Sequence, residues 1–182
     1  MANKNNKRKS IDKVLTGLGT IATIALLIIG GLAWWAYSFT TTNVRNELAA
    51  QKIYFPPKGS PALASPAIGP YLDKYAGEQL LTGAQAKAYA DHFIAVHLSE
   101  VAGGKTYAQI SSEVQANPAN AKLKAEQQTL FQGETLRGLL LGDAYAFATV
   151  GQIAQVVAIV CFVAGGIMLL LVLLGLWHIS TL

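Results

Sequence analysis

The chain has 182 residues, of which 52% are apolar and only 13% are charged, and its formal net charge is +4. Soluble domains carry about a quarter charged residues, so this composition excludes an entirely water-soluble protein and predicts that part of the chain lies in lipid. The excess positive charge precedes residue 14 and the remainder is balanced. The basic pI of about 9.2 therefore does not indicate nucleic-acid binding.

Two long stretches lack charge altogether. Residues 14–39 follow a basic N-terminus of residues 1–13, and residues 144–179 precede a short tail of residues 180–182. About 20 apolar residues in a helix cross the hydrocarbon core of a bilayer, and a backbone in lipid must be hydrogen-bonded internally. Both stretches are therefore predicted to be transmembrane helices. A cleaved signal peptide is the alternative for the first, but its apolar run exceeds the roughly 7–15 residues usual for one.

The flanking residues predict the orientation. Five basic residues precede the first stretch: Lys4, Lys7, Arg8, Lys9 and Lys13. Basic flanks favour the cytoplasmic side, which places both termini in the cytoplasm and residues 40–143 outside the plasma membrane. Aromatic residues typical of membrane interfaces agree with these boundaries: Trp34, Trp35, Tyr37, Tyr145 and Trp177.

The first half of the region between the spans changes character at a cluster of prolines. The first helix is expected to continue to about Gln51, because TTTNVRNELAAQKI is polar and compatible with a helix. Residues 55–70 contain five of the six prolines, which predicts an extended linker rather than a packed element. Its apolar residues Leu63 and Ile68 suggest that this linker lies along a surface.

The second half is predicted to be helical. Thr82 with Gln85, and Thr106 with Gln109, have capping-box spacing, which predicts one helix from about Gly83 to Val101 and a second, shorter one. Asn117 is expected to cap a third helix that Gly133 interrupts. From Glu134 onward a long helix is expected to enter the second span. The predicted fold is thus an all-α membrane protein with two transmembrane helices, a small helical extracytoplasmic domain and a Pro-rich extended linker.

No residue pattern predicts catalysis, a metal or a cofactor. The single cysteine, Cys161, lies within the second span, where a small apolar role is expected. His92 and His97 are five residues apart, which turns them roughly 140° from each other on a helix, whereas helical zinc sites prefer a spacing of four. Nucleophile, phosphate-loop and dinucleotide motifs are absent from the sequence.

Small and amide residues near the second span are the candidate helix-packing or partner contacts. Glycines allow close helix approach, and an amide in lipid favours a partner helix. The candidates are Gly138, Gly142, Gln152, Gln155, Gly165 and Gly166.

Four segments carry a resemblance to a known family. They read NVRNELAAQKIYFPP, YAGEQLLTGAQAKAYADHFIAVHL, GKTYAQISS and GETLRGLLLGDAYAF. With these, residues 15–177 resemble the two-span accessory subunits of actinobacterial respiratory supercomplexes, which join cytochrome bcc to cytochrome c oxidase. The resemblance implies a non-catalytic structural or assembly role in the plasma membrane, with the cytochrome bcc and oxidase subunits as partners and no cofactor of its own.

Two other classes of function remain open. A stand-alone membrane-anchored binding or sensor module would need an outer pocket, with Tyr71, Tyr75, Tyr89, Phe93 and Tyr107 as candidate lining residues, although a small core would use them equally well. Members of the resembling family have also carried the label of a ring-opening dioxygenase. Such an enzyme needs two histidines and a carboxylate on one iron, and the spacing of His92 and His97 argues against it.

Overall fold

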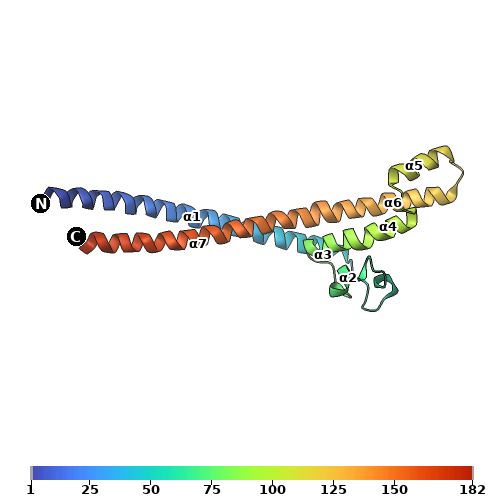
Figure 1. Cartoon of the computed structure of the whole chain (residues 1–182), viewed down its shortest axis with the longest axis horizontal. Coiled ribbons are helices and arrows are strands. Elements are labelled where there is room, and N and C mark those ends of the chain that lie inside the picture. The colour runs from blue at the N-terminus through green and yellow to red at the C-terminus, as the bar shows by residue number, and fades with distance from the viewer. Residues whose placement is uncertain (1, 182) are drawn as a thin grey trace. The chain divides into compact units, whose positions relative to one another are not determined.

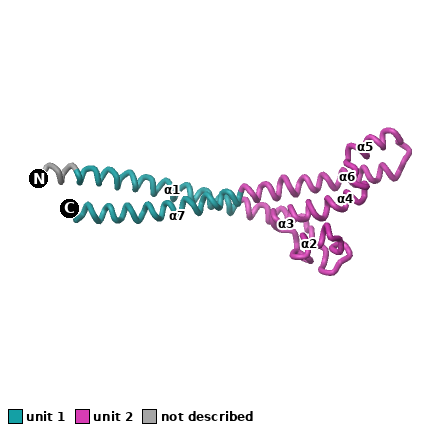
Figure 2. Tube along the Cα trace, in the orientation of Figure 1, with its two compact units in different colours: residues 1–39, 151–182 teal, residues 40–150 magenta. Residues whose placement is uncertain are grey.

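The computed structural model describes the backbone of residues 2–181 and the side chains of residues 8–181. The side chains of Lys4 and Lys7, on which part of the predicted orientation rests, lie outside the described residues. The chain divides into two compact units (Figure 2), one of residues 1–39 and 151–182 and the other of residues 40–150. Regular structure in the described part is helical, apart from one isolated bridge between Tyr54 and Gln79.

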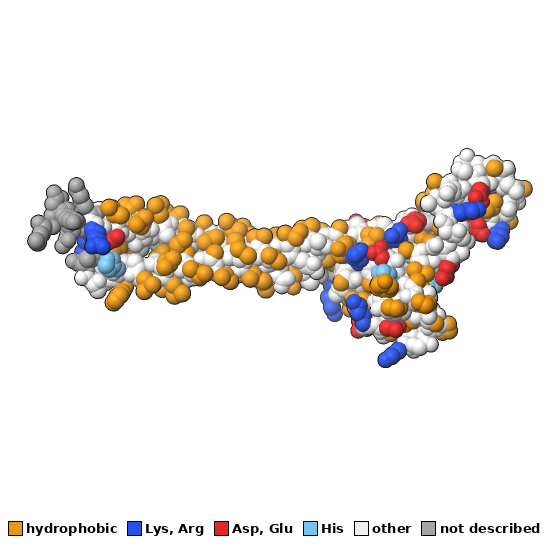
Figure 3. Space-filling view, viewed as in Figure 1, with side chains coloured by type: hydrophobic (Ala, Val, Ile, Leu, Met, Phe, Trp, Pro, Cys, Tyr) orange, Lys and Arg blue, Asp and Glu red, His pale blue; other side chains and the backbone are white. Residues whose placement is uncertain are grey.

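The first unit is an antiparallel pair of helices (Figure 1), formed by the part of α1 (Ala2–Gln51) up to residue 39 and the part of α7 (Phe147–Thr181) from residue 151. Neither helix contains a proline, and apolar side chains cover the faces of the pair (Figure 3). Two helices of the described chain, within Arg8–Gln51 and Ala121–Thr181, are long and apolar enough to cross a membrane. The prediction of an all-helical chain with two long apolar helices is therefore confirmed for the described residues, and α1 ends at Gln51 as expected.

Glycines bring the two helices of this unit together. A Cβ built on Gly30 would lie 2.9 Å from the Phe162 ring, and one on Gly19 would lie 3.0 Å from Val172. At the other end of the pair, a Cβ on Gly175 would lie 2.7 Å from Thr16 Oγ1. Larger side chains at these positions would separate the helices, so the missing Cβ atoms set their distance.

The second unit consists of short helices packed against longer ones. One bent helix comprises α3 (Gly83–Ala88), the π-helical η3 (Tyr89–Ile94) and α4 (Ala95–Ala102). A long helix comprises α6 (Ala121–Leu139), the π-helical η4 (Leu140–Ala146) and the start of α7. The remaining elements are η1 (Pro61–Leu63), α2 (Gly69–Leu72), η2 (Asp73–Tyr75) and α5 (Tyr107–Ala116).

Both predicted capping boxes are present. Thr82 accepts a hydrogen bond from the Gln85 backbone N–H at 3.2 Å, and Thr106 accepts one from that of Gln109 at 3.3 Å. In each box the side-chain oxygen of the glutamine accepts a hydrogen bond from the backbone N–H of the threonine. The helices therefore begin where the sequence predicts, because the first-turn N–H groups find partners there.

The predicted start of the third helix is wrong. Asn117 ends α5, and Asn120 caps α6 by accepting a hydrogen bond from the Leu123 N–H at 3.2 Å. The predicted interruption at Gly133 is also absent. Gly133 lies inside α6. The Leu98 side chain of α4 occupies the space where a Cβ would stand, so this glycine allows close helix packing and does not break the helix.

The proline-rich segment 55–70 differs from the expected extended linker. Its apolar residues are buried in the core of the second unit: Phe55 and Ile68 are each 2% exposed and Leu63 is 6% exposed. Proline begins the turn of η1 at Pro61, and the Ser60 side chain caps it. Burial of these three side chains outweighs the extended tendency of the prolines, so the segment is a packed part of the unit.

Candidate functional site

Gly138 and Gly142 lie on an uncovered face of the long helix. Apart from the adjoining residues and the nearby backbone of the same helix, no atom lies within 4 Å of a Cβ built on either glycine. Phe131 stands two turns before Gly138 on the same face and is 54% exposed. We call the surface of Phe131, Gly138 and Gly142 the α6 face. The Phe131 ring also meets the Tyr107 ring of α5, with centroids 6.1 Å apart, so the uncovered part of this face is centred on the two glycines.

A shallow apolar groove adjoins the α6 face. It has a volume of about 170 Å³, and its floor includes the buried side chains of Val44, Leu48 and Leu140. Leu139 on its edge is 53% exposed, and Glu47 and Asp143 supply two carboxylates. The groove and the face together make an apolar surface with acidic residues at its margin.

The other predicted contact residues divide between covered and open positions. A Cβ on Gly165 would lie 3.3 Å from the Leu27 side chain, whereas Gly166 faces open space. Gly165 therefore packs against the first span, and Gly166 does not.

The two glutamines of the second span lie near its aromatic end. Continuing the antiparallel register set by Gly165–Leu27 and Gly30–Phe162 brings Gln155 level with Tyr37 and Gln152 about one turn beyond it. That is the end of the pair that carries the Trp34 and Trp35 rings. Gln152 is exposed and Gln155 half-buried, so the Gln152 amide does not join the two spans to each other.

The two histidines of the second unit do not share a site. The His92 ring stacks on Tyr71, with centroids 3.6 Å apart, while His97 Nδ1 lies 2.7 Å from the Phe93 carbonyl oxygen. No group of three or more His, Cys, Asp or Glu side chains able to hold a metal ion occurs among residues 8–181. The His92–His97 spacing thus places the two rings against different neighbours.

A polar, aromatic-walled pocket of about 350 Å³ surrounds the His92 ring. We call it the Tyr71 pocket. Its polar and aromatic lining residues are Tyr71, Lys74, Tyr75, Lys87, Asp91, His92 and Tyr145. Of the five aromatic residues suggested by the sequence, only Tyr71 and Tyr75 line it. Tyr89 and Phe93 stack on each other, and Tyr89 also contacts Phe55 of the core, while Tyr107 lines a separate cavity between α4 and α6.

Sequence reasoning missed Lys74, Lys87, His92 and Tyr145 as pocket residues. They come from three segments distant in sequence, η2, the α3–η3 helix and η4. The only local signal is the spacing of Lys87 and Asp91, four residues apart on one helix, which predicts an ion pair. Nothing in the sequence brings Tyr71 or Tyr145 to that pair.

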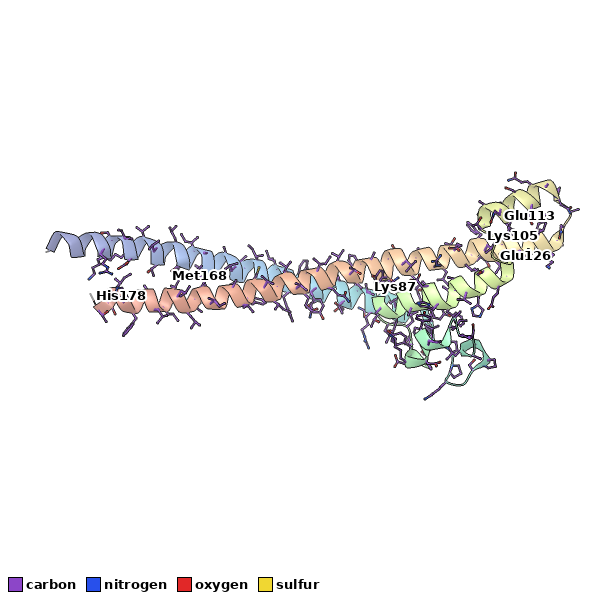
Figure 4. All side chains as sticks on the ribbon, in the orientation of Figure 1. Lys87, Lys105, Glu113, Glu126, Met168 and His178 are labelled. Carbon is purple, nitrogen blue, oxygen red and sulfur yellow. The ribbon has the colours of Figure 1, made fainter. Side chains whose placement is uncertain are left out.

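An ion-pair network fixes the acidic residue of the pocket. Asp91 Oδ2 pairs with Lys87 Nζ, Asp91 Oδ1 lies 3.5 Å from Arg137 Nη2, and Arg137 Nη1 lies 3.3 Å from Glu134. Lys87 is labelled in Figure 4. Its hydrogen bond to Asp91 holds the pKa of the Asp91 carboxyl below its usual value, and the same bond raises the pKa of Lys87. Both groups are therefore ionised at neutral pH.

Together these features define a helical protein with two apolar helices fit to span a membrane, a helix face with two uncovered glycines and a polar pocket. Comparison with protein-family models, with curated proteins and with solved structures finds no match to this chain.

Proposed function

We propose that this chain is a non-catalytic accessory subunit of the respiratory supercomplex of cytochrome bcc and cytochrome c oxidase. In this proposal both apolar helices cross the plasma membrane, both termini are cytoplasmic, and residues 40–143 form the extracytoplasmic helical domain. The support consists of the two apolar helices, the basic residues before the first of them, and the sequence resemblance over residues 15–177.

The observation that carries the proposal is the α6 face. Phe131 and Leu139 are each more than half exposed, and both glycines beside them present bare backbone to open space. Exposed large apolar side chains next to small residues are typical of a surface that another protein covers. This face lies in the unit that the proposal places outside the membrane, where lipid would not cover it.

The test is affinity purification of the tagged chain from membranes in mild detergent, followed by an optical difference spectrum of the eluate. We expect haem bands of b, c and a type together. The variants Gly138→Leu and Gly142→Leu should reduce these bands while the chain remains in the membrane fraction, because a leucine would keep a partner helix at a distance. A colourless eluate, with the intact supercomplex left in the unbound fraction, would overturn the proposal.

Ala125→Leu is the matched control. Ala125 is exposed on the same helix, but its position is turned by roughly 140° from Gly138 at 3.6 residues per turn. Haem recovery should equal that of the wild type. If Ala125→Leu reduces recovery as much as Gly138→Leu does, added bulk on α6 acts non-specifically and the α6 face is not the contact.

The Tyr71 pocket favours a second candidate, a membrane-anchored binding module that acts alone. Its volume and its mixture of aromatic and charged walls suit a small ligand. This candidate predicts that the purified chain binds its ligand with the cytochromes absent, and that Gly138→Leu leaves function in cells unchanged. Loss of function on that substitution would instead favour the accessory subunit.

A further inference from the structure

The charge balance of the Tyr71 pocket is positive. Lys74 has no carboxylate within ion-pair distance among residues 8–181, and its ammonium group lies 4.8 Å from the centre of the Tyr75 ring. The one acidic lining residue, Asp91, is already held by both Lys87 and Arg137. An ammonium group has three N–H donors, so Lys87 retains donors after pairing with Asp91.

The walls of the pocket suit a membrane interface. Tyr71 is 48% exposed, Lys87 lies 5.2 Å from the centre of the Tyr145 ring, and a tyrosine presents an apolar ring with a polar end to such an interface. Tyr145 also belongs to the charge-free stretch of residues 144–179 and stands two residues before α7 begins. In a chain that spans the membrane, this residue is at the level of the lipid headgroups.

We propose that the Tyr71 pocket binds the phosphate of an anionic phospholipid headgroup. Lys74 and Lys87 pair with the phosphate oxygens, and the phenol groups of Tyr71 and Tyr145 donate hydrogen bonds to the phosphate or its glycerol. A choline headgroup brings a cation toward two lysines, so phosphatidylglycerol binds more tightly than phosphatidylcholine. This assignment goes beyond the accessory role and holds whether or not the chain works inside a larger complex.

The test uses the full chain, purified alone in detergent and titrated with phosphatidylglycerol or phosphatidylcholine, with bound lipids counted by native mass spectrometry. Lys74→Gln should weaken phosphatidylglycerol binding about tenfold, the effect of losing one charge-assisted hydrogen bond. The fold is not at risk, because Lys74 is exposed and its ammonium group lies over the face of the Tyr75 ring without an ion pair. Lys58→Gln is the matched control, an exposed lysine of the same unit outside the pocket.

Each outcome is decisive. Weaker phosphatidylglycerol binding in Lys74→Gln, with Lys58→Gln equal to the wild type, supports the site; the basic N-terminus is the same in all three proteins and cancels in the comparison. Equal losses in both variants, or no preference for phosphatidylglycerol over phosphatidylcholine, overturn it. If inorganic phosphate binds in a Lys74-dependent way and the lipid does not, the pocket takes a free phosphate and the lipid assignment is wrong. This experiment does not measure co-purification with cytochromes, so failure of the lipid site and failure of the accessory role can be told apart.

Discussion

The ring of His92 lies flat on the ring of Tyr71, with centroids 3.6 Å apart and planes within 3°. The contact joins α2, which follows the proline-rich segment, to the π-helical η3. These residues are 21 positions apart in the sequence, so the stack ties a packed loop to the principal helix of the second unit.

Removing the stack between His92 and Tyr71 should lower the stability of the second unit. His92→Ala is expected to lower the free energy of unfolding of the second unit by about 1 kcal/mol, the usual value of an aromatic pair beyond its area burial. Thermal denaturation followed by circular dichroism measures the change. His92→Phe retains a stacking ring and should restore most of the stability; if it is as unstable as His92→Ala, the imidazole acts through something other than the stack.

The glycines of α6 should respond to alanine in opposite ways. Gly133→Ala forces its new methyl group into the Leu98 side chain and should cost about 1–3 kcal/mol, as overpacking does. Gly138→Ala adds a methyl group in open space and should stabilise the helix by up to about 1 kcal/mol through helix propensity. The two melting curves, compared with the wild type, provide the check. A destabilising Gly138→Ala would mean that this face is covered in the isolated chain.

A neighbouring pair of glycines gives the same contrast inside the first unit. A Cβ on Gly30 would meet Phe162 and Cys161, whereas one on Gly31 meets nothing within 4 Å. Gly30→Leu should therefore part the two helices and expose Cys161, the only cysteine of the chain. We expect faster labelling of Cys161 by a membrane-permeant maleimide in Gly30→Leu than in Gly31→Leu. Equal rates would show that the helices do not touch at this level in the bilayer.

The ion pair of Lys87 and Asp91 should stabilise the fold over a wide pH range, and its contribution should change with pH only in strong acid or strong base. The pKa of the Asp91 carboxyl is lowered from 3.8 on folding, so its contribution is present above that value and is lost as the pH falls through the folded pKa below it. The pKa of Lys87 is raised from 10.5, so its contribution is lost only as the pH rises through a folded pKa above that value. The stability difference between wild type and Asp91→Asn should be constant between about pH 5 and 9 and should shrink in stronger acid. Thermal melts at these pH values test it, and a difference that persists in strong acid would assign the effect to packing.

Local rules predicted much of the fold. The two long apolar helices are predictable because each charge-free stretch is longer than the roughly 20 residues that cross a bilayer. The capping boxes of Thr82 and Thr106 are predictable because each depends on two residues three positions apart. Asn117 was a plausible N-cap by the same local rule, but its N–H donates a hydrogen bond to the Glu113 carbonyl oxygen and Asn117 instead caps the C-terminal end of α5. Whether Gly133 breaks or packs depends on Leu98, 35 residues earlier, which no local pattern contains.

The candidate site shows the same limit. Gly138 and Gly142 could be singled out from their spacing, yet the sequence does not reveal that both face open space. The Tyr71 pocket depends on bringing α2, η3 and η4 together, and that arrangement follows from buried side chains such as Leu72 and Ala90, which are fully buried, and not from the pocket residues themselves.

The π-helical turn at Tyr89–Ile94 helps to determine which residues of its helix face the core. The buried residues of this helix recur every four positions: Ala86, Ala90, Ile94, Leu98 and Ala102. In a regular α-helix, a four-residue repeat drifts by about 40° at each step, so the last of them would face far from the first. The wider π turn takes back part of that drift and keeps the row on the core. Deleting one residue between 89 and 94 would replace the π turn with a regular α turn and keep the helices on either side nearly in phase, whereas deleting one residue of α4 before Leu98 would rotate the row beyond it by about 100° and carry Leu98 away from Gly133. Natural variants of this protein should therefore change length in the π turn more readily than in α4.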